Sequence, residues 1–165
     1  MSYAERILEE LKAKNADQPE FIQAATEILS TLGPALDAHP EYEENALLER
    51  FVEPERVVMF RVPWVDDSGK VQVNRGYRVE FNSAIGPYKG GLRFNPTVTL
   101  GMLKFLGLEQ ILKKQPYHAS HGWRQRWFRL RPPRASRITK SCIFCQSFMT
   151  ELCRHIGPNT DVPAG

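Results

Sequence analysis

The chain has 165 residues, 42% of them hydrophobic and 25% charged, which is enough for one domain with a substantial core. No apolar run approaches the roughly 20 residues that a membrane-spanning helix needs, so we expect no membrane partner. The first residues include Glu5, Glu9 and Glu10 and no apolar signal core, and three cysteines are an odd number for disulfide pairing. A reduced, cytoplasmic protein is therefore expected.

The net charge of +3 conceals an uneven distribution. Residues 115–143 contain six arginines and Lys140 but no acidic residue, a local charge of +7. The other residues carry 15 basic and 19 acidic side chains, a net charge of −4. This basic block differs in composition from the rest of the chain and needs its own explanation.

The first third of the chain is predicted to be helical. Apolar residues at helical spacing predict a helix over 3–14, and a second helix begins after Pro19. The pair Gly33-Pro34 is expected to kink this second helix. After a break at His39-Pro40, residues 42–51 are predicted to form a short third helix.

Two strands are predicted next. Residues 57–65 form a near-continuous apolar run with many β-branched side chains, and residues 66–69 are typical of a turn. Residues 71–81 are the expected hairpin partner. A loop rich in glycine then follows at 86–91 and contains Lys89.

A further helix is predicted between Asn95-Pro96 and Lys113, with Thr97 or Thr99 as its N-cap. Its apolar face is expected to run through Leu100, Leu103, Leu106 and Ile111, with Lys104 and Lys113 on other faces. After the basic block, a helix resumes at Phe144 and is expected to end at Gly157-Pro158. Residues 161–165 are expected to begin another strand.

This order of elements predicts an α/β fold, with N-terminal helices followed by a mixed sheet flanked by helices. We expect an N-terminal helical segment over 1–55 and an α/β domain over 56–165. Within that domain residues 114–143 are aberrant and are expected to be disordered.

Residues 78–94, RVEFNSAIGPYKGGLRF, resemble the substrate-binding loop of hexameric glutamate dehydrogenases, in the Glu/Leu/Phe/Val dehydrogenase family. The resemblance runs from ADQPEF at Ala16 through LLERFVEPERV at Leu47 to TELCRHIGPNTDVPAG at the end, and fails over about 114–143. It implies that 1–55 is a helical assembly segment and that 56–165 is the substrate-binding part of the substrate and dimerisation domain of such an enzyme, truncated before the Rossmann domain. It also implies NAD or NADP as cofactor in the full-length enzyme, L-glutamate and 2-oxoglutarate as ligands, and a homo-hexamer.

The resemblance also implies a substrate site. Lys89 is expected to pair with the side-chain carboxylate of glutamate, while Gln110 and Lys113 hold its α-carboxylate. Gly90 and Gly91 would let the backbone approach the ligand closely. An ammonium group is a compact charge that suits a carboxylate, which agrees with these roles.

The catalytic groups of the family are not expected in this chain. The codon of the catalytic lysine, in a GGGKGG loop, would straddle Gln125 and Arg126, so that neither residue can serve. The catalytic aspartate is expected just after Gly165. We therefore predict no catalytic residue, no bound cofactor and no activity for these 165 residues.

A shifted reading frame explains the basic block. HGWRQRWFR can be encoded CAT GGG TGG CGG CAA AGG TGG TTC CGA, and one base later this DNA reads MGGGKGGS. That peptide is the family's lysine loop at the expected distance from YKGG. Single-base insertions near Lys114, Pro132-Pro133 and Ile143-Phe144 would restore the flanking frame.

Three other interpretations of this region remain. The block can be a disordered basic loop, or a nucleic-acid-binding module through Arg124–Arg137, with arginines for phosphates and aromatic rings for bases. Cys142, Cys145, Cys153 and His155 offer four potential zinc ligands, but buried helix cysteines are the simpler interpretation and no metal is expected. His118 and His121 are given no role.

Overall fold

The structure is a computed structural model that describes residues 1–66, 68–84, 86, 88, 95, 97–114 and 136–157; for 113, 114 and 136–142 it describes the backbone alone. The chain divides into two compact units. The first comprises Met1–Arg56, Val79–Ala84 and Arg93–Ala119. The second comprises Val57–Arg78, Ile85–Leu92 and Ser120–Gly165.

The first unit is mainly helical. Helix α1, Tyr3–Lys14, begins with a capping box, in which the hydroxyl of Ser2 accepts from the N–H of Glu5 and the Glu5 carboxylate accepts from the N–H of Ser2. Helix α2, Pro19–Asp37, starts at a proline, which suits the first turn because its missing N–H would be unpaired there. Both helices were predicted, and α2 continues through Pro34 to its end.

The predicted third helix is two helices instead of one. Helix α3, Glu41–Glu44, and helix α4, Leu47–Val52, are separated at Ala46, whose φ of 50° lies in the left-handed region. A residue in that conformation cannot continue a right-handed helix. The apolar spacing over 42–51 did not reveal this break, because Ala46 is a residue type that favours helices.

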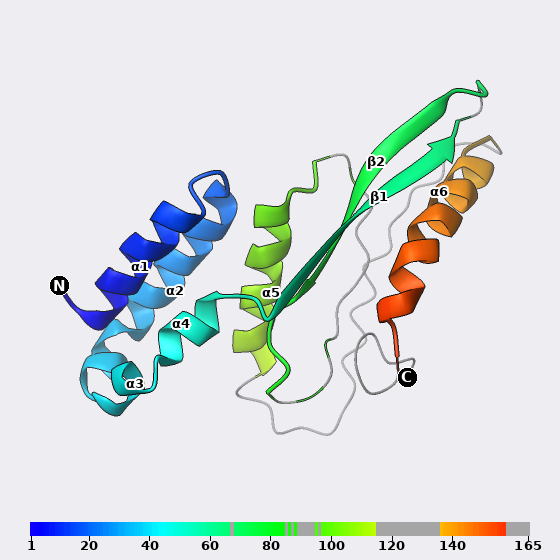
Figure 1. Cartoon of the computed structure of the whole chain (residues 1–165). Helices are drawn as coiled ribbons and strands as arrows, with labels where there is room; N and C mark the ends of the chain where they lie inside the picture. The colour runs from blue at the N-terminus through cyan, green and yellow to red at the C-terminus, as the bar shows by residue number, and fades with distance from the viewer. Residues whose placement is uncertain are drawn as a thin grey trace. The chain divides into compact units, whose positions relative to one another are not determined.

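The core of the first unit brings α1, α2 and α4 together with the end of a strand and with helix α5, Leu100–Lys114. Figure 1 shows α1, α2 and α5 as neighbouring helices. The buried side chains that form this core are Tyr3, Ala4, Ile7, Leu11, Phe21, Ala25, Leu29, Leu36, Leu48, Val52, Phe81 and Leu108. Those from α1 and α2 recur at helical spacing, as the sequence predicts.

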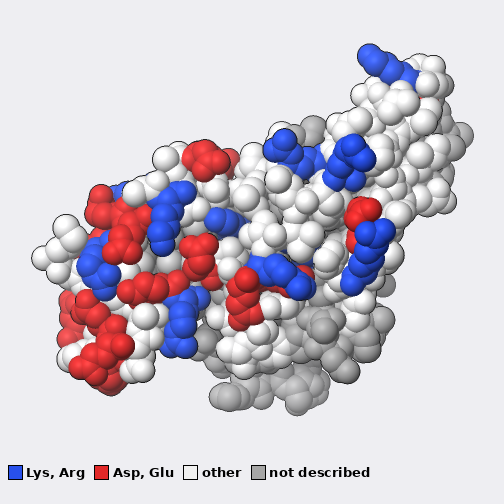
Figure 2. Space-filling model, in the orientation of Figure 1, with Lys and Arg blue, Asp and Glu red and all other residues white. Residues whose placement is uncertain are grey.

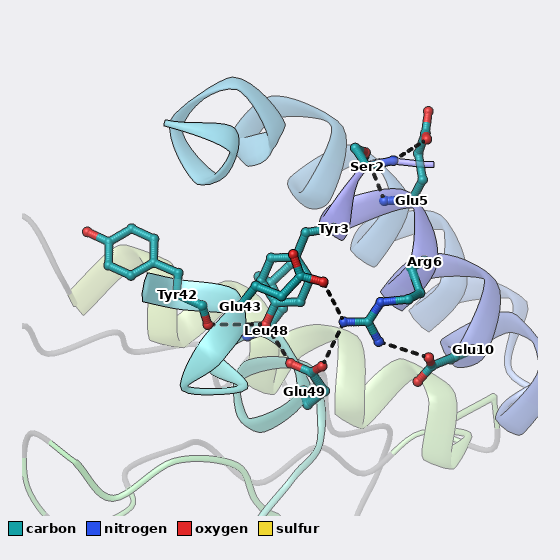
Figure 3. Close-up of polar contacts among 9 residues, drawn as sticks. All are labelled: Ser2, Tyr3, Glu5, Arg6, Glu10, Tyr42, Glu43, Leu48 and Glu49. Carbon is teal, nitrogen blue, oxygen red and sulfur yellow. Dashed lines mark hydrogen bonds and ion pairs between the residues drawn. The ribbon is translucent and has the colours of Figure 1, made fainter. Parts of the chain in front are cut away.

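A network of polar contacts joins α1 to α4 next to this core (Figure 3). The hydroxyl of Tyr3 donates to a Glu49 carboxylate oxygen at 2.5 Å and accepts from the N–H of Leu48 at 2.9 Å. Burial, and then the hydrogen bond to the Glu49 carboxylate, raises the pKa of Tyr3. Burial opposes ionisation of Glu49, yet bonds from Tyr3 and Arg6 lower the pKa of its carboxyl group. The network therefore ties α1 to α4 through a charged carboxylate.

The surface of the N-terminal helices is acidic. Residues 1–56 hold 13 acidic and 5 basic side chains, a net charge of −8. Figure 2 shows Asp and Glu side chains gathered over this part of the molecule. Arg6 sits within reach of three of them, with ion pairs of 3.1 Å to Glu10, 3.1 Å to Glu43 and 3.3 Å to Glu49. Because these groups are partly exposed, each pair contributes little to stability.

The predicted hairpin is present. Strands β1, Arg56–Val65, and β2, Val71–Glu80, pair with each other, and the N–H of Asp66 bonds the carbonyl of Lys70 across the turn. Gly69 in that turn has a φ of 77°, which glycine adopts without strain. At the other end the N–H of Glu55 bonds the carbonyl of Phe81, so the ribbon is antiparallel. Any further strand of the expected mixed sheet would lie outside the described residues.

Helix α6, Ser136–Leu152, packs on one face of this hairpin (Figure 1). The ring of Phe60 lies 5.1 Å from that of Phe148, and Trp64 meets Phe144 edge-on at 5.9 Å. The helix begins eight residues before the predicted start at Phe144. The helical backbone extends upstream because no proline or glycine follows Pro133 until Gly157. A short 3-10 helix, η1, Cys153–His155, follows α6.

None of the described helices has both the length and the apolar character that would let it cross a membrane.

Candidate functional site

Helix α5 carries two of the predicted substrate-binding positions, and its start is well defined. The hydroxyl of Thr99 accepts from the N–H of Met102 at 3.1 Å, which makes Thr99 the N-cap. Thr97, the alternative cap in the sequence analysis, instead donates from its hydroxyl to the side chain of Asn95 at 2.9 Å. The helix start is thus fixed by the local sequence.

The predicted apolar face of α5 is only partly correct, because Ile111 packs against the core but the most buried positions are others. Lys104 is buried, with 7% of its surface exposed, whereas Leu100, Leu103 and Leu106 are only partly buried. The ammonium group of Lys104 donates to the side-chain carbonyl of Asn15 at 2.8 Å and lies 5.3 Å from the centre of the Phe21 ring. The amide nitrogen of Asn15 in turn donates to the carbonyl of Leu11 at 3.0 Å. Lys104 therefore points into the corner between α1 and α2.

Two glycines let α5 approach its neighbours closely. A Cβ added at Gly101 would lie 2.9 Å from Cβ of Gln18, and one at Gly107 would lie 2.8 Å from the ring of Phe81. Real Cβ atoms essentially never make contacts that short, so a side chain at either position would push α5 away. With Leu108 fully buried, these contacts hold the helix that presents position 110.

The end of β2, which leads into the glycine loop, is held by two polar contacts. Glu80 is 1% exposed, and Arg56 donates to both its oxygens, from Nε at 2.7 Å and from Nη2 at 2.8 Å. A two-point pair of this kind fixes geometry as well as charge. Beyond it, the carboxylate of Glu55 accepts from the N–H of Ser83 at 2.9 Å.

Among the predicted substrate-binding residues, the structure fully describes Gln110 alone. Gln110 lies on α5 with its side chain exposed, where its amide can donate to a carboxylate. Lys113 is on the same helix, but its side chain lies outside the described part of the chain. Lys89, Gly90 and Gly91 also lie outside it.

Most of the other positions singled out in the sequence also lie outside the described residues. Gln125 and Arg126, where the catalytic lysine is expected to be lost, lie outside the described residues, and so does Gly165. The same holds for His118, His121 and Arg124. Arg137 is in α6 without a described side chain. The nucleic-acid hypothesis therefore gains no support from the structure.

The possible zinc ligands are not gathered into a metal site as far as the structure describes them. The thiol of Cys153 donates to the carbonyl of Thr150 at 3.4 Å. Within the described residues, no three His, Cys, Asp or Glu side chains are grouped so as to hold a metal ion. The side chain of Cys142 is not described.

Several residues that support this region were missed by the sequence analysis. Asn15 and Lys104 join α1 to α5, and Arg56 and Glu80 join the two strands at their base. Strand alternation held a signal for Glu80, because Tyr77, Val79 and Phe81 face one side and a charge on the other side needs a partner. For Lys104 there was none, since helical spacing does not say which face meets the core.

The matching protein family is consistent with this architecture. Residues 54–165 match the family model for the Glu/Leu/Phe/Val dehydrogenase dimerisation domain, which is more than half of the chain. The chain therefore belongs to the Glu/Leu/Phe/Val dehydrogenase family, as the resemblance implied.

Individual relatives extend the similarity to the N-terminal helices. The chain is 58% identical to the NAD-specific glutamate dehydrogenase of Clostridium symbiosum over 99% of its own length and 36% of that protein. It is 52% identical to the NADP-specific glutamate dehydrogenase of Helicobacter pylori, with 99% and 36% covered. A solved structure of a glutamate dehydrogenase superposes with a TM-score of 0.84 at 54% identity, covering 99% of this chain and 38% of that one.

The chain thus spans about a third of the length of the relatives that it matches. What the similarity shows for these residues is the fold of a glutamate dehydrogenase N-terminal domain.

Proposed function

We propose that this chain is the substrate-binding and assembly part of an NAD(P)-dependent glutamate dehydrogenase. The whole enzyme would oxidise L-glutamate to 2-oxoglutarate and ammonia, with the hydride passing to the nicotinamide. The observation that carries the proposal is the similarity to glutamate dehydrogenases over 99% of the chain, at up to 58% identity. A homo-hexamer, as the family resemblance implies, and a cytoplasmic location belong to the same proposal. The odd number of cysteines, three in the whole chain, fits a reducing compartment.

In this proposal three polar side chains hold the substrate. The ammonium of Lys89 binds the side-chain carboxylate, and Gln110 and Lys113 bind the α-carboxylate. Gly90 and Gly91 leave the loop backbone free to approach the ligand. These roles are supported by the position of Gln110, which is exposed on α5. The contacts of Lys104 and Gly107 with neighbouring segments hold that helix in place. A rigid support is what a precise carboxylate site requires.

The residues present here do not fit a nicotinamide dinucleotide. The 165 residues contain no G-x-G-x-x-G sequence, and the described strands form an antiparallel hairpin, whereas a dinucleotide site needs a parallel βαβ unit. Binding of NAD or NADP is therefore attributed to parts of the enzyme other than these residues. The named relatives include both NAD-specific and NADP-specific enzymes, so either cofactor is compatible with the family.

We further propose that the basic block 115–143 results from a shifted reading frame. Its charge of +7 within an otherwise acidic chain supports this, as does the MGGGKGGS peptide in the neighbouring frame. Without that lysine loop, a protein limited to these 165 residues should not reduce NAD(P)+ in the presence of L-glutamate. A dehydrogenase assay that follows absorbance of the reduced cofactor would contradict this if it showed turnover above the blank.

Substrate binding is tested by calorimetric titration of the chain with 2-oxoglutarate. Replacing Lys89 or Lys113 with Met removes one charge-assisted bond, and each change should weaken binding about tenfold or more. Lys70→Met is the matched control, because Lys70 is exposed in the hairpin turn and should leave binding unchanged. Equal affinity of the parent, K89M and K113M would refute the assignment.

A further inference from the structure

A buried polar contact in the first unit joins α1, α2 and α5. Lys104 of α5 is 7% exposed, and Asn15, which ends α1, is 5% exposed. The Lys104 ammonium group donates to the side-chain oxygen of Asn15 at 2.8 Å and lies 5.3 Å from the centre of the Phe21 ring of α2. Both partners that the structure describes for this cation are neutral. We call the contact between Asn15 and Lys104 the buried pair.

Net stability does not explain a lysine buried among neutral partners. Removing an ammonium group from water costs free energy, and hydrogen bonds to neutral groups return only part of it. When both members of a buried polar pair are replaced by apolar groups of similar shape, the folded state commonly keeps its stability or gains some. The buried pair therefore needs an explanation in geometry.

The Asn15 end of the buried pair is held rigidly. The backbone N–H and the side-chain nitrogen of Asn15 both donate to the carbonyl of Leu11, each at 3.0 Å. The carbonyl of Asn15 accepts from the N–H of Gln18 at 2.9 Å, in the turn between α1 and α2. Because these bonds fix the direction of the Asn15 side chain, its oxygen is a stationary acceptor for Lys104.

Helix α5 contacts the same turn at a second position. A Cβ added at Gly101 would lie 2.9 Å from Cβ of Gln18 and 3.1 Å from its Cα, so α5 passes close to the turn. Gly101 and Lys104 are three residues apart and share one side of the helix. The contact at Gly101 limits how near α5 can come. The directional bond from Lys104 also fixes the rotation of α5 and its position along its own axis.

We propose that Lys104, held by Asn15, is a positioning residue for Gln110 in the substrate site. The inference rests on the proposed function and deepens it, because it gives a role at that site to a side chain buried in the core. Gln110 is exposed and follows Lys104 by six residues, which is about 9 Å along the helix axis. Lys104 therefore acts through the helix, and sets where the Gln110 amide lies when it donates to the α-carboxylate. A displacement of about 1 Å is enough to impair a site of this kind.

The experiment replaces both members of the buried pair with apolar side chains of similar size, Asn15→Leu together with Lys104→Met. Urea denaturation should give a midpoint equal to or above that of the parent, because neither change leaves the other partner unpaired. Calorimetric titration with 2-oxoglutarate should nevertheless show binding weakened about tenfold or more. Lys12→Met is the matched control, because the ammonium group of Lys12 pairs with Glu9 of its own helix at 2.8 Å. It should change neither the midpoint nor the affinity.

A second comparison tests whether the effect passes through Gln110. In a Gln110→Ala background the same double change should weaken binding of 2-oxoglutarate by a smaller factor, because one of the groups that it displaces is gone. Equal factors in the two backgrounds would overturn the proposal, and so would an unfolded or less stable double variant, which would assign the buried pair to stability.

The outcome for the parent separates this proposal from the proposed function. A parent that does not bind 2-oxoglutarate refutes the substrate site, and the positioning role of Lys104 with it. A parent that binds, with a folded double variant of the same affinity, refutes the positioning role alone.

Discussion

At the residue scale, the carboxylate of Asp66 at the tip of the hairpin is a charged group held by several hydrogen bonds. It accepts from the N–H groups of Ser68 and Lys70 at 2.9 and 3.1 Å, from the Ser68 hydroxyl, and from the side chain of Gln72 at 2.8 Å. The bonds from Ser68 and Gln72, above all, lower the pKa of Asp66 from 3.8 to about 2. A carboxyl group whose pKa is depressed by folding stabilises the folded state when ionised.

Asp66 should therefore make stability depend on pH in a narrow acid window. Its contribution is present above pH 4 and is lost as the pH falls towards the folded pKa of about 2. Asp66→Asn should lower the melting temperature at pH 7, and the difference from the parent should shrink below pH 4 and vanish near pH 2. Lys70→Gln, in the same turn, keeps all the bonds to Asp66 and should retain the parental profile. A difference that is constant from pH 7 to pH 2 would contradict this assignment.

Ala46 and Lys104 show which residues the sequence could not place. Ala46 adopts a φ of 50° although nothing in its own chemistry favours the left-handed region, so the surrounding contacts of α3 and α4 must impose it. Lys104 was predicted to lie off the apolar face of its helix, yet Asn15 and the Phe21 ring give it a polar and an aromatic partner in the core. The contact between Lys104 and Asn15 joins residues that are 89 positions apart in the sequence.

At the element scale, the base of the hairpin depends on the pair formed by Arg56 and Glu80. The Glu80 side chain is 1% exposed, so removal of Arg56 would leave a buried carboxylate without its main cation. Arg56→Met should lower the free energy of unfolding by about 1–3 kcal/mol. The reason is that a buried Glu80 carboxylate without a cation costs more free energy than the loss of the contact itself. Urea denaturation measures this change.

The double variant Arg56→Met with Glu80→Gln separates the two contributions. Since it also removes the buried charge, it should be more stable than R56M alone. If the double variant is as unstable as the sum of the two single variants, the residues are not coupled and the interpretation is wrong.

Helix and strand patterns predicted α1, α2, the hairpin and α5, because each has a strong local signal: an apolar stripe, a turn that contains glycine or a threonine cap. Local signals failed at element junctions. The start of α6 at Ser136 was missed because residues 136–143 have no apolar period, although they also contain no helix breaker. Spacing alone cannot distinguish such a segment from a loop.

At the scale of the whole molecule, the family was predictable because its loop sequence around Lys89 is specific. The roles of Lys89, Gln110 and Lys113 came from that resemblance, and helical or strand periodicity could not have supplied them. The structure adds how α5, which carries Gln110, is held: Gly101 and Lys104 lie against residues of the N-terminal helical region, and Gly107 lies against Phe81. These contacts are between segments far apart in sequence, which is why they escaped prediction.

The proposed frame shift makes a prediction about the stability of the entire chain. Replacing 115–143 with the frame-restored peptide, which has MGGGKGGS in place of HGWRQRWFR, removes a net charge of +7 that the neighbouring sequence does not balance. We expect the restored chain to unfold more cooperatively and with a higher melting temperature, by about 4–8 °C if the gain is roughly 2 kcal/mol. Differential scanning calorimetry measures both quantities. A control with the restored residues in shuffled order has the same composition and charge, so it should gain less if the order of residues matters. Equal melting curves for the parent and the restored chain would show that the block belongs to the fold as it stands.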